Sequence, residues 1–159
     1  MRLSHNDFLA VVKNAPLVSM DILAADASGR VLVGLRKNEP ARGDWFVPGG
    51  CVQKGETLAK AFARISAGEL GREMAFSVAR FLGVYEHFYP VNFAGEPGFD
   101  THYVVLAYQV DGEGLSPPAD DDQHEAWRWL LPDEILADPG VHENTRRYFQ
   151  EDQTHAGPV

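Results

Sequence analysis

Apolar and polar residues repeat along this chain with two different periods. In residues 4–14 the apolar side chains recur every three to four positions, which predicts a short amino-terminal helix capped by Ser4. Residues 17–25 and 31–36 are apolar and strand-like. The turn-forming segment 26–30 lies between them, so this part of the chain predicts a β-hairpin.

The remaining pattern completes the architecture. Apolar residues at helical spacing predict a central helix at 57–70. The pattern further predicts four strands, at 45–47, 78–88, 102–111 and 127–130. It also predicts two closing helices, at 132–137 and 142–150. This order predicts an α/β fold of the α+β type, in which a mixed β-sheet lies between helices on both faces. We expect one domain over residues 1–159, with a frayed tail at 151–159.

Charge and composition narrow the classes of function. The chain has 159 residues and a net charge of −9, from 14 basic and 23 acidic side chains. This balance argues against broad binding of nucleic acids or anionic membranes, although a local pocket can still be positive. One cysteine permits no intramolecular disulfide, and no apolar run approaches the roughly 20 residues of a membrane span. We therefore predict a cytoplasmic protein with a small-molecule ligand.

The segment GDWFVPGGCVQKGETLAKAFARISAGELG, residues 43–71, carries candidate chemistry. Gly49 and Gly50 leave a backbone that can turn sharply, approach a ligand and present carbonyl oxygens. Glu69, near the end of the predicted helix, supplies a carboxylate. A carbonyl, a carboxylate and substrate phosphates together are a common way to hold Mg²⁺.

Glu56 lies at the start of this predicted helix and Arg64 lies near its middle. Negative charge is favourable at a helix start. The two residues are eight positions apart, so they can meet only through a folded turn. A structural brace and direct contact with the ligand are both compatible with the sequence.

The segment resembles the Nudix box. Five residues match that pattern in register: Gly50, Glu56, Arg64, Glu69 and Gly71. Four positions depart from it, with Ile65 and Gly68 in place of glutamates and Ser66 and Arg72 in place of apolar residues.

Outside the box, the resemblance extends over residues 3–150 to the GDP-mannose mannosyl hydrolases, an atypical Nudix branch. It rests on stretches such as WFVPGG, EHFYPVNF, THYVVLAY and DDQHEAWRWL. That branch also lacks the additional glutamates. The resemblance implies Mg²⁺-dependent hydrolysis of GDP-mannose or GDP-glucose at the sugar C1, with inversion. A conventional pyrophosphatase and a catalytically silent nucleotide-sugar binding domain are the alternatives.

The absence of glutamates at positions 65 and 68 is compatible with cleavage of the bond between the sugar C1 and the diphosphate oxygen. The C1–oxygen bond breaks through an oxocarbenium-like transition state that expels GDP, so one metal ion and a few cations are sufficient. The attacking water then needs a separate base with a pKa near neutral, and histidine is the natural choice. Gln123 and His124 are predicted just before a strand, in a loop that overhangs the site.

The resemblance implies a role for each of these residues. His124 would be the general base. Gly49 (through its carbonyl), Glu69 and Gln123 would hold one Mg²⁺, or alternatively Mn²⁺. Arg36 would bind the diphosphate and Tyr103 would donate a hydrogen bond to the β-phosphate. Without the resemblance, a loop histidine, a strand-end arginine and a half-buried tyrosine are ordinary structural residues.

Further substrate contacts are expected from four parts of the chain. Asp21 lies within the apolar strand LVSMDILAA, where a buried charge needs a partner such as a sugar hydroxyl or an arginine. His87 is predicted to contact the sugar or to make a structural hydrogen bond. Arg64 is a candidate substrate ligand. The resemblance places Arg2, Leu3 and Phe8 near guanine, although Phe8 can equally pack within its helix.

One position weakens the resemblance. Cys51 stands where the mannosyl hydrolases have an arginine that stabilises the departing diphosphate. A thiol supplies no positive charge, and Lys54, Lys37 or Arg64 could compensate. The resemblance also implies a homodimer with the amino terminus near the partner's site.

Overall fold

The computed structural model describes residues 3–119 and 122–150. Two predictions lie outside the described residues: Arg2 as part of the guanine site, and the frayed tail at 151–159.

Seven strands form one mixed sheet. Five of them follow the order β3-β2-β1-β6-β5, while β4 pairs with β1 and β7 pairs with β2. The pairing of β1 with β6 is parallel and the other pairings are antiparallel. The strands are β1 (Leu17–Ala25), β2 (Val31–Arg36), β3 (Trp45–Phe46), β4 (Gly49–Cys51), β5 (Arg80–Tyr89), β6 (Thr101–Asp111) and β7 (His124–Leu130).

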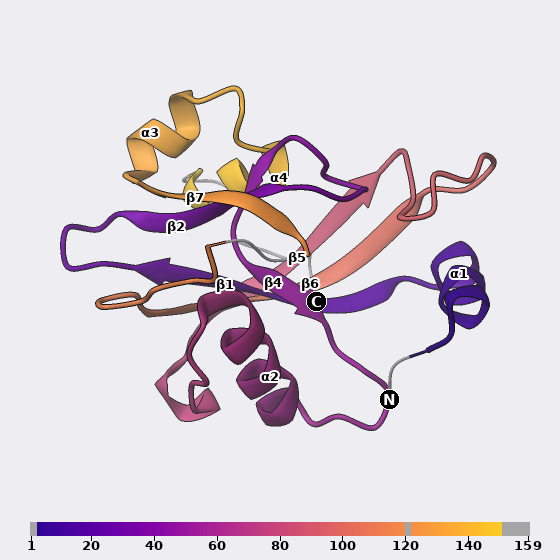
Figure 1. Cartoon of the computed structure of the whole chain (residues 1–159), viewed down its shortest axis with the longest axis horizontal. Coiled ribbons are helices and arrows are strands. Elements are labelled where there is room, and N and C mark those ends of the chain that lie inside the picture. Colours follow the sequence, from indigo (N-terminus) through magenta and orange to yellow (C-terminus); the bar gives the residue numbers. More distant parts are fainter. Residues whose placement is uncertain (1–2, 120–121, 151–159) are drawn as a thin grey trace.

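Helices cover both faces of this sheet. Helix α2 lies against one face, while α3 and α4 lie on the other, and α1 stands at one end (Figure 1). The helices are α1 (His5–Asn14), α2 (Leu58–Leu70), α3 (Pro132–Ala137) and α4 (Glu143–Arg146), with 3-10 helices η1 (Phe76–Val78) and η2 (Arg147–Phe149). The predicted α+β fold with helices on both faces is confirmed. Within the described ranges, each helix falls short of the length and apolarity that crossing a membrane requires.

Helix α2 has clear start and stop signals. Thr57 is its N-cap, and the Thr57 hydroxyl accepts a hydrogen bond from the Lys60 amide at 3.3 Å. Gly71 ends the helix in the left-handed conformation, with φ 70°, where only glycine is unstrained. A Cβ there would also lie 2.7 Å from the Ser116 carbonyl oxygen. Leu58, the first residue of the helix, is 40% exposed.

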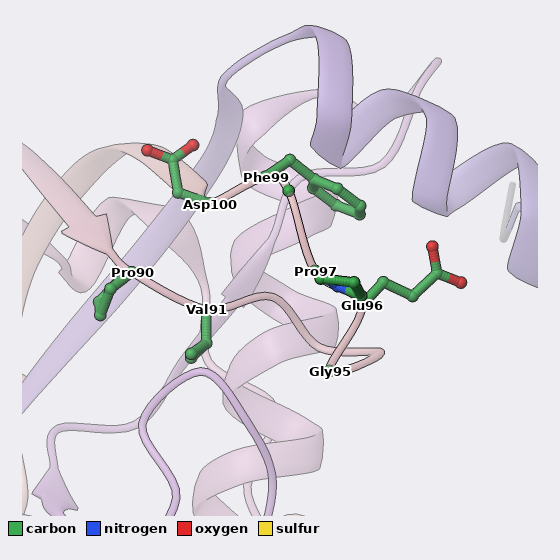
Figure 2. A pocket seen from close by; sticks show the side chains of 8 residues that line it. Pro90, Val91, Gly95, Glu96, Pro97, Phe99 and Asp100 are labelled. Carbon is green, nitrogen blue, oxygen red and sulfur yellow. The ribbon is translucent and has the colours of Figure 1, made fainter.

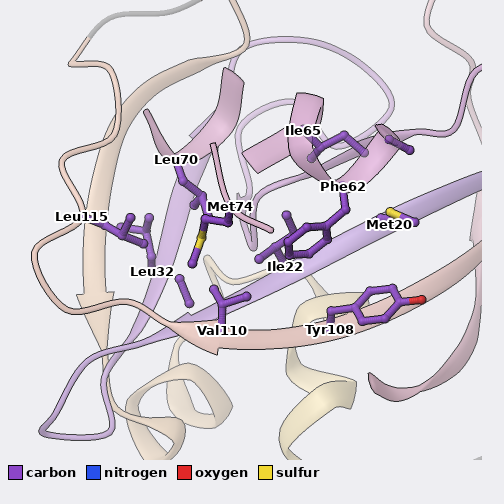
Figure 3. Close-up of a cluster of buried hydrophobic side chains, with 12 residues drawn as sticks. Met20, Ile22, Leu32, Phe62, Ile65, Leu70, Met74, Tyr108, Val110 and Leu115 are labelled. Carbon is purple, nitrogen blue, oxygen red and sulfur yellow. The ribbon is translucent and has the colours of Figure 1, made fainter. Parts of the chain in front are cut away.

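The core between α2 and the sheet follows from the alternation of side chains along β1. Met20, Ile22 and Ala24 are fully buried and face α2, where they pack with Phe62 and Ile65 (Figure 3). The intervening residue Leu23 belongs to a second cluster on the opposite face. Asp21 alternates in the same way, so it also points away from α2.

Three element boundaries differ from the prediction in ways that affect the site. Residues 76–78 form η1, so β5 begins at Arg80. Residues 49–51 form strand β4, where a turn was predicted. Strand β7 begins at His124, three residues earlier than predicted. The last two differences arise from pairing with β1 and β2, strands distant in sequence, which local patterns do not reveal.

Candidate active site

One cavity of about 1560 Å³ lies at the end of the sheet between α1, α2 and the loop after β2. Its lining includes every predicted site residue within the described ranges except His124. These residues are Leu3, Phe8, Asp21, Arg36, Gly49, Arg64, Glu69, His87, Tyr103 and Gln123. The fold therefore brings together residues that the sequence distributes over 120 positions.

The cavity is locally cationic although the protein is acidic. Its lining holds five basic side chains, Arg36, Lys37, Arg42, Lys54 and Arg64, against three carboxylates, Asp21, Glu39 and Glu69. The net charge of the whole chain is −9. A positive cavity on a negative protein favours a compact anionic ligand over an extended polyanion.

Gly49 and Gly50 form a strand, so the predicted sharp turn was wrong. Gly49 faces Asp21 across the β1–β4 pair. A Cβ at Gly49 would lie 2.4 Å from Asp21 Oδ1 and 2.5 Å from the Met20 carbonyl oxygen, and one at Gly50 would lie 3.2 Å from Ile65. The glycines are needed for close packing of β4 on its neighbours rather than for a special backbone angle.

The same register settles where the Gly49 carbonyl points. The Ile22 amide donates to the Pro48 carbonyl at 2.8 Å, so Asp21 and Gly49 form a non-hydrogen-bonded antiparallel pair. In such a pair the backbone N–H and C=O point away from the partner strand. The carbonyl oxygen of Gly49 is thus directed away from β1, at a residue that lines the cavity.

A polar chain connects α2 with β2 through Gln123. Arg36 Nη1 donates to Gln123 Oε1 at 3.1 Å, and Gln123 Nε2 donates to Glu69 Oε1 at 3.3 Å. The buried Nε of Arg36 has no hydrogen-bond partner among the described residues. A buried donor of this kind is costly unless a ligand satisfies it, so Arg36 is placed to bind an anion.

His124 was predicted in an overhanging loop, and this placement was wrong. It is the first residue of β7, paired with Arg36 of β2, and is only 1% exposed. Its ring packs on Trp127 at 4.4 Å, and a Cβ at Gly34 would lie 2.6 Å from it. Its Nδ1 lies 3.7 Å from Glu69 Oε2. The pairing of β7 with β2 explains the burial of His124. The hydrogen bonds between these two segments extend beyond His124, as far as the Gln123 carbonyl and the Lys37 amide.

Glu56 and Arg64 meet through a folded turn. Arg64 Nε donates to Glu56 Oε1 at 2.6 Å, and Arg64 Nη2 donates to Glu56 Oε2 at 2.9 Å. Arg64 Nη2 also donates to the Cys51 carbonyl at 2.8 Å. The hydrogen bonds from Arg64, together with one from the Gln53 amide, lower the pKa of Glu56 to about 2. Glu56 and Arg64 therefore form the structural brace that was one of the two alternatives from the sequence. Arg64 also lines the cavity, so contact with a ligand is compatible with this brace.

The two absent glutamates have different structural settings. Ile65 is 3% exposed and packs beneath Gly50 in the core. Gly68 lines the cavity, and a Cβ added there would meet nothing within 4 Å. An acid could therefore be accommodated at position 68, whereas at 65 an apolar side chain now supports β4.

The donors around Glu69 fit one hard divalent cation. Residues 3–119 and 122–150 contain no cluster of three or more His, Cys, Asp or Glu placed to hold a metal. The available set is mixed: the Gly49 carbonyl directed away from β1, the Glu69 carboxylate, and the Gln123 amide, whose NH₂ group donates to Glu69 and whose oxygen accepts from Arg36. Rotation of the Gln123 amide by about 180° would direct its oxygen towards Glu69 and a bound cation. Neutral and charged oxygens with room for water suit Mg²⁺ or Mn²⁺.

A residue that sequence reasoning missed lies beneath the floor of the cavity, in contact with two of the side chains that line it. Tyr148 Oη donates to Asp21 Oδ2 at 2.5 Å and lies 3.3 Å from His87 Nε2. Burial raises the pKa of Asp21 to about 7 and lowers that of His87 to about 3. Burial also raises the pKa of Tyr103, so its hydroxyl keeps its proton. No local pattern marks Tyr148, because its partners are 61 and 127 residues away.

A second missed residue, Phe93, stands at the α1 end of the cavity. Its ring lies 4.8 Å from that of Phe8 and 5.4 Å from that of His5, and all three residues line the cavity. The loop that carries Phe93 is organised by the buried side chain of Asn92, which hydrogen-bonds the backbone of residues 94, 96 and 99. Phe8 therefore belongs to an aromatic wall.

A second cavity, of about 700 Å³, is lined by residues of this loop (Figure 2). Its lining consists of Pro90, Val91, Gly95, Glu96, Pro97, Gly98, Phe99 and Asp100. Two carboxylates and no basic side chain occur among these described residues, so it lacks the charge that a phosphate ligand needs.

Residues 15–151 match the family description "NUDIX domain". The chain belongs to the Nudix hydrolase family. It is 39% identical over 151 residues to low-salt glycan biosynthesis protein Agl8 of Haloferax volcanii, covering 93% of this chain and 89% of that protein. It is 31% identical over 113 residues to an ADP-ribose pyrophosphatase of Methanocaldococcus jannaschii, covering 70% of this chain and 60% of that one.

Solved structures share the same fold. A MutT Nudix hydrolase from Burkholderia pseudomallei is 29% identical, with TM-score 0.65 over 86% of this chain and 97% of that one. A MutT protein from Methanosarcina mazei, 18% identical, has TM-score 0.66 over 86% and 92% of the two chains. At that identity the second likeness concerns the fold alone.

Proposed function

We propose that this protein hydrolyses GDP-mannose, or GDP-glucose, to GDP and the free hexose by attack of water at C1 with inversion. The observation that carries the proposal is the composition of the cavity around Glu69. Five basic side chains suit a diphosphate, while positions 65 and 68 lack the acids that attack at phosphorus would use. The similarity to a protein named for glycan biosynthesis agrees with a sugar substrate.

Arg36 and Tyr103 are assigned to the departing diphosphate. The buried Nε of Arg36 has no partner among the described residues, and Tyr103 retains its hydroxyl proton. Both residues line the cavity and donate hydrogen bonds, which become stronger as negative charge develops on GDP. When held by Gly49, Glu69 and Gln123, Mg²⁺ or Mn²⁺ supplies further positive charge that neutralises this leaving group.

His124 is assigned as the base that takes the proton from the attacking water. Its Nδ1 lies 3.7 Å from the Glu69 carboxylate, which orients the ring. His124 itself is buried outside the cavity lining, whereas its neighbour Gln123 lines the cavity, so the proposal requires that water reach the imidazole past Gln123. One base that delivers one water leaves no covalent intermediate, and the expected outcome is inversion at C1.

Guanine is assigned to the aromatic wall at α1. Phe8 and Phe93 offer ring faces and Leu3 adds an apolar contact, all at the cavity. Arg64 stands at the opposite side, where its guanidinium is shared with Glu56. The proposal includes a single domain, a homodimer with the amino terminus near the partner's site, and a cytoplasmic location.

A conventional pyrophosphatase acting on a nucleoside diphosphate sugar is the second candidate. The 31% identity to a protein named ADP-ribose pyrophosphatase favours it. A silent nucleotide-sugar binding domain is the third, and Cys51 in place of a cation favours that one.

Hydrolysis in ¹⁸O-labelled water distinguishes the three. A panel of nucleotide sugars is incubated with Mg²⁺, and the products are analysed by mass spectrometry. Label in the hexose, together with GDP, supports cleavage at carbon. Label in a phosphate product, with GMP and sugar phosphate, supports the pyrophosphatase. Binding of GDP-mannose without any product supports the silent domain.

A further inference from the structure

Three side chains form a hydrogen-bonded chain beneath the cavity. Tyr148 of η2 lies between Asp21 of β1 and His87 of β5, with oxygen–oxygen and oxygen–nitrogen distances of 2.5 Å and 3.3 Å. Asp21 and His87 line the cavity and are 7% and 3% exposed, while Tyr148 does not line it. Tyr148 thus connects two cavity residues from behind.

The protons in this chain can be assigned by counting donors. A tyrosine hydroxyl has one proton, and an ionised carboxylate can only accept. Tyr148 therefore donates to Asp21, and His87 Nε2 must donate to the Tyr148 oxygen. Burial raises the pKa of Tyr148 and lowers that of His87 to about 3, so both are neutral when Asp21 is ionised. A neutral imidazole protonated on Nε2 keeps a lone pair on Nδ1.

The geometry points to Tyr148 as a positioning residue that makes Asp21 and His87 a pair of hydrogen-bond acceptors for hydroxyl groups of the substrate's hexose. This inference rests on the proposed function and adds a residue to it. Hydroxyl groups donate hydrogen bonds, so two oriented acceptors beside a cationic cavity select a nucleotide sugar over a bare nucleotide.

The tautomer of His87 is the first test, and it does not depend on catalysis. Proton–nitrogen correlation spectra of ¹⁵N-histidine-labelled protein at pH 8.5 report which ring nitrogen is protonated, and His87→Gln identifies the signal. We expect the Nε2-protonated form in the wild type and in Tyr85→Phe, a matched control whose ring packs on Tyr148 at 4.6 Å. Tyr148→Phe should shift His87 towards the Nδ1-protonated form. An Nδ1-protonated wild type, or a Tyr148→Phe spectrum like the wild type, overturns the inference.

Binding tests the consequence for the substrate. Titration calorimetry in EDTA, where metal-dependent hydrolysis does not proceed, compares GDP-mannose with GDP. Tyr148→Phe should weaken GDP-mannose binding about tenfold and leave GDP binding unchanged, because only the hexose uses the acceptor pair. Tyr85→Phe should change neither.

Equal weakening of both ligands would mean a structural role and overturn the inference, as would a wild type that binds GDP-mannose no better than GDP. If hexose-selective binding depends on Tyr148 but no nucleotide sugar is hydrolysed, the proposed function fails and the inference stands.

Discussion

The two sides of the cavity shift the pKa values of their ionisable side chains in opposite senses: one side favours the charged forms and the other the neutral forms. On the α2 side, Glu56 and Arg64 are eight residues apart and hydrogen-bonded near solvent, and the pKa of Glu56 falls to about 2. On the floor, Asp21 is buried and its pKa rises to about 7, while that of His87 falls to about 3. The side chains on the α2 side therefore stay ionised, whereas the side chains on the floor favour their neutral forms.

This difference separates two tasks within one site. Paired, accessible charges suit a diphosphate and a metal ion, which arrive with charge of their own. Buried groups with weakened charge suit an uncharged hexose, which offers hydroxyl groups and apolar ring faces. The comparison therefore divides the proposed substrate between the two sides.

The largest expected effect comes from His124→Gln. If His124 is the base, kcat for GDP-mannose falls by roughly 10²–10⁴-fold with little change in KM. Steady-state kinetics measure this, with His102→Gln as a control because His102 lies outside the cavity lining. Full activity in His124→Gln would show that His124 is not the general base. Asp21 on the floor, with a pKa of about 7, would then be the next candidate.

Glu69→Gln tests whether the metal belongs to the α2 side. Loss of the carboxylate charge should weaken Mn²⁺ binding by about 10–100-fold, which electron paramagnetic resonance of free Mn²⁺ measures without turnover. The exposed Glu73, just beyond the same helix, provides the control Glu73→Gln. Unchanged Mn²⁺ affinity in Glu69→Gln would show that the ion is held elsewhere.

Cys51→Arg strengthens the charged side. The thiol lines the cavity, and burial raises its pKa to about 11, so it carries no charge. An arginine there should raise kcat for GDP-mannose by about tenfold, since it adds a cation near the leaving group. Thermal unfolding confirms that the variant is folded. A folded variant without gain would mean that another lining cation, such as Arg64 or Lys54, already acts there.

Asp21→Asn tests the floor through the pH dependence of stability. The pKa of Asp21 is about 7 in the folded state against an ordinary 3.8, so between these values the folded protein holds a proton that the unfolded chain releases. This contribution to stability is complete below pH 4 and declines as pH rises to 7, by roughly 1 kcal/mol per pH unit.

The Asn variant lacks that decline, so its stability relative to wild type should increase from pH 4 to pH 8. Chemical denaturation at several pH values measures the difference, and Asp100→Asn serves as an exposed control. Parallel stability curves for wild type and Asp21→Asn would show that Asp21 titrates normally.

Sequence patterns predicted most elements because these depend on local chemistry. The amino-terminal helix has its Ser4 cap, with the Asp7 amide 3.2 Å from the Ser4 hydroxyl. The hairpin strands 17–25 and 31–36 match β1 and β2. The predicted helix 142–150 is shorter than expected, since η2 follows α4 at Arg147. Alternation, caps and turns all act within a few residues.

The site was predicted less completely. Twelve residues were assigned candidate roles from the sequence and its resemblance, and ten of them line one cavity. The strand at Gly49–Cys51, the burial of His124 and the hydrogen bonds of Tyr148 were not foreseen. Each depends on a partner strand or helix far away in the chain, so no short stretch of sequence contains the information.

By itself, therefore, the sequence determined the layered α+β fold, the family and the kinds of chemical group at the site. Only the tertiary structure decided how those groups behave. It buried Asp21 and His87 and connected them through Tyr148, while it left Glu56 and Arg64 near solvent. The physical reason is that residue type sets which charges and hydrogen bonds are available, whereas burial and long-range contacts set their pKa values and directions.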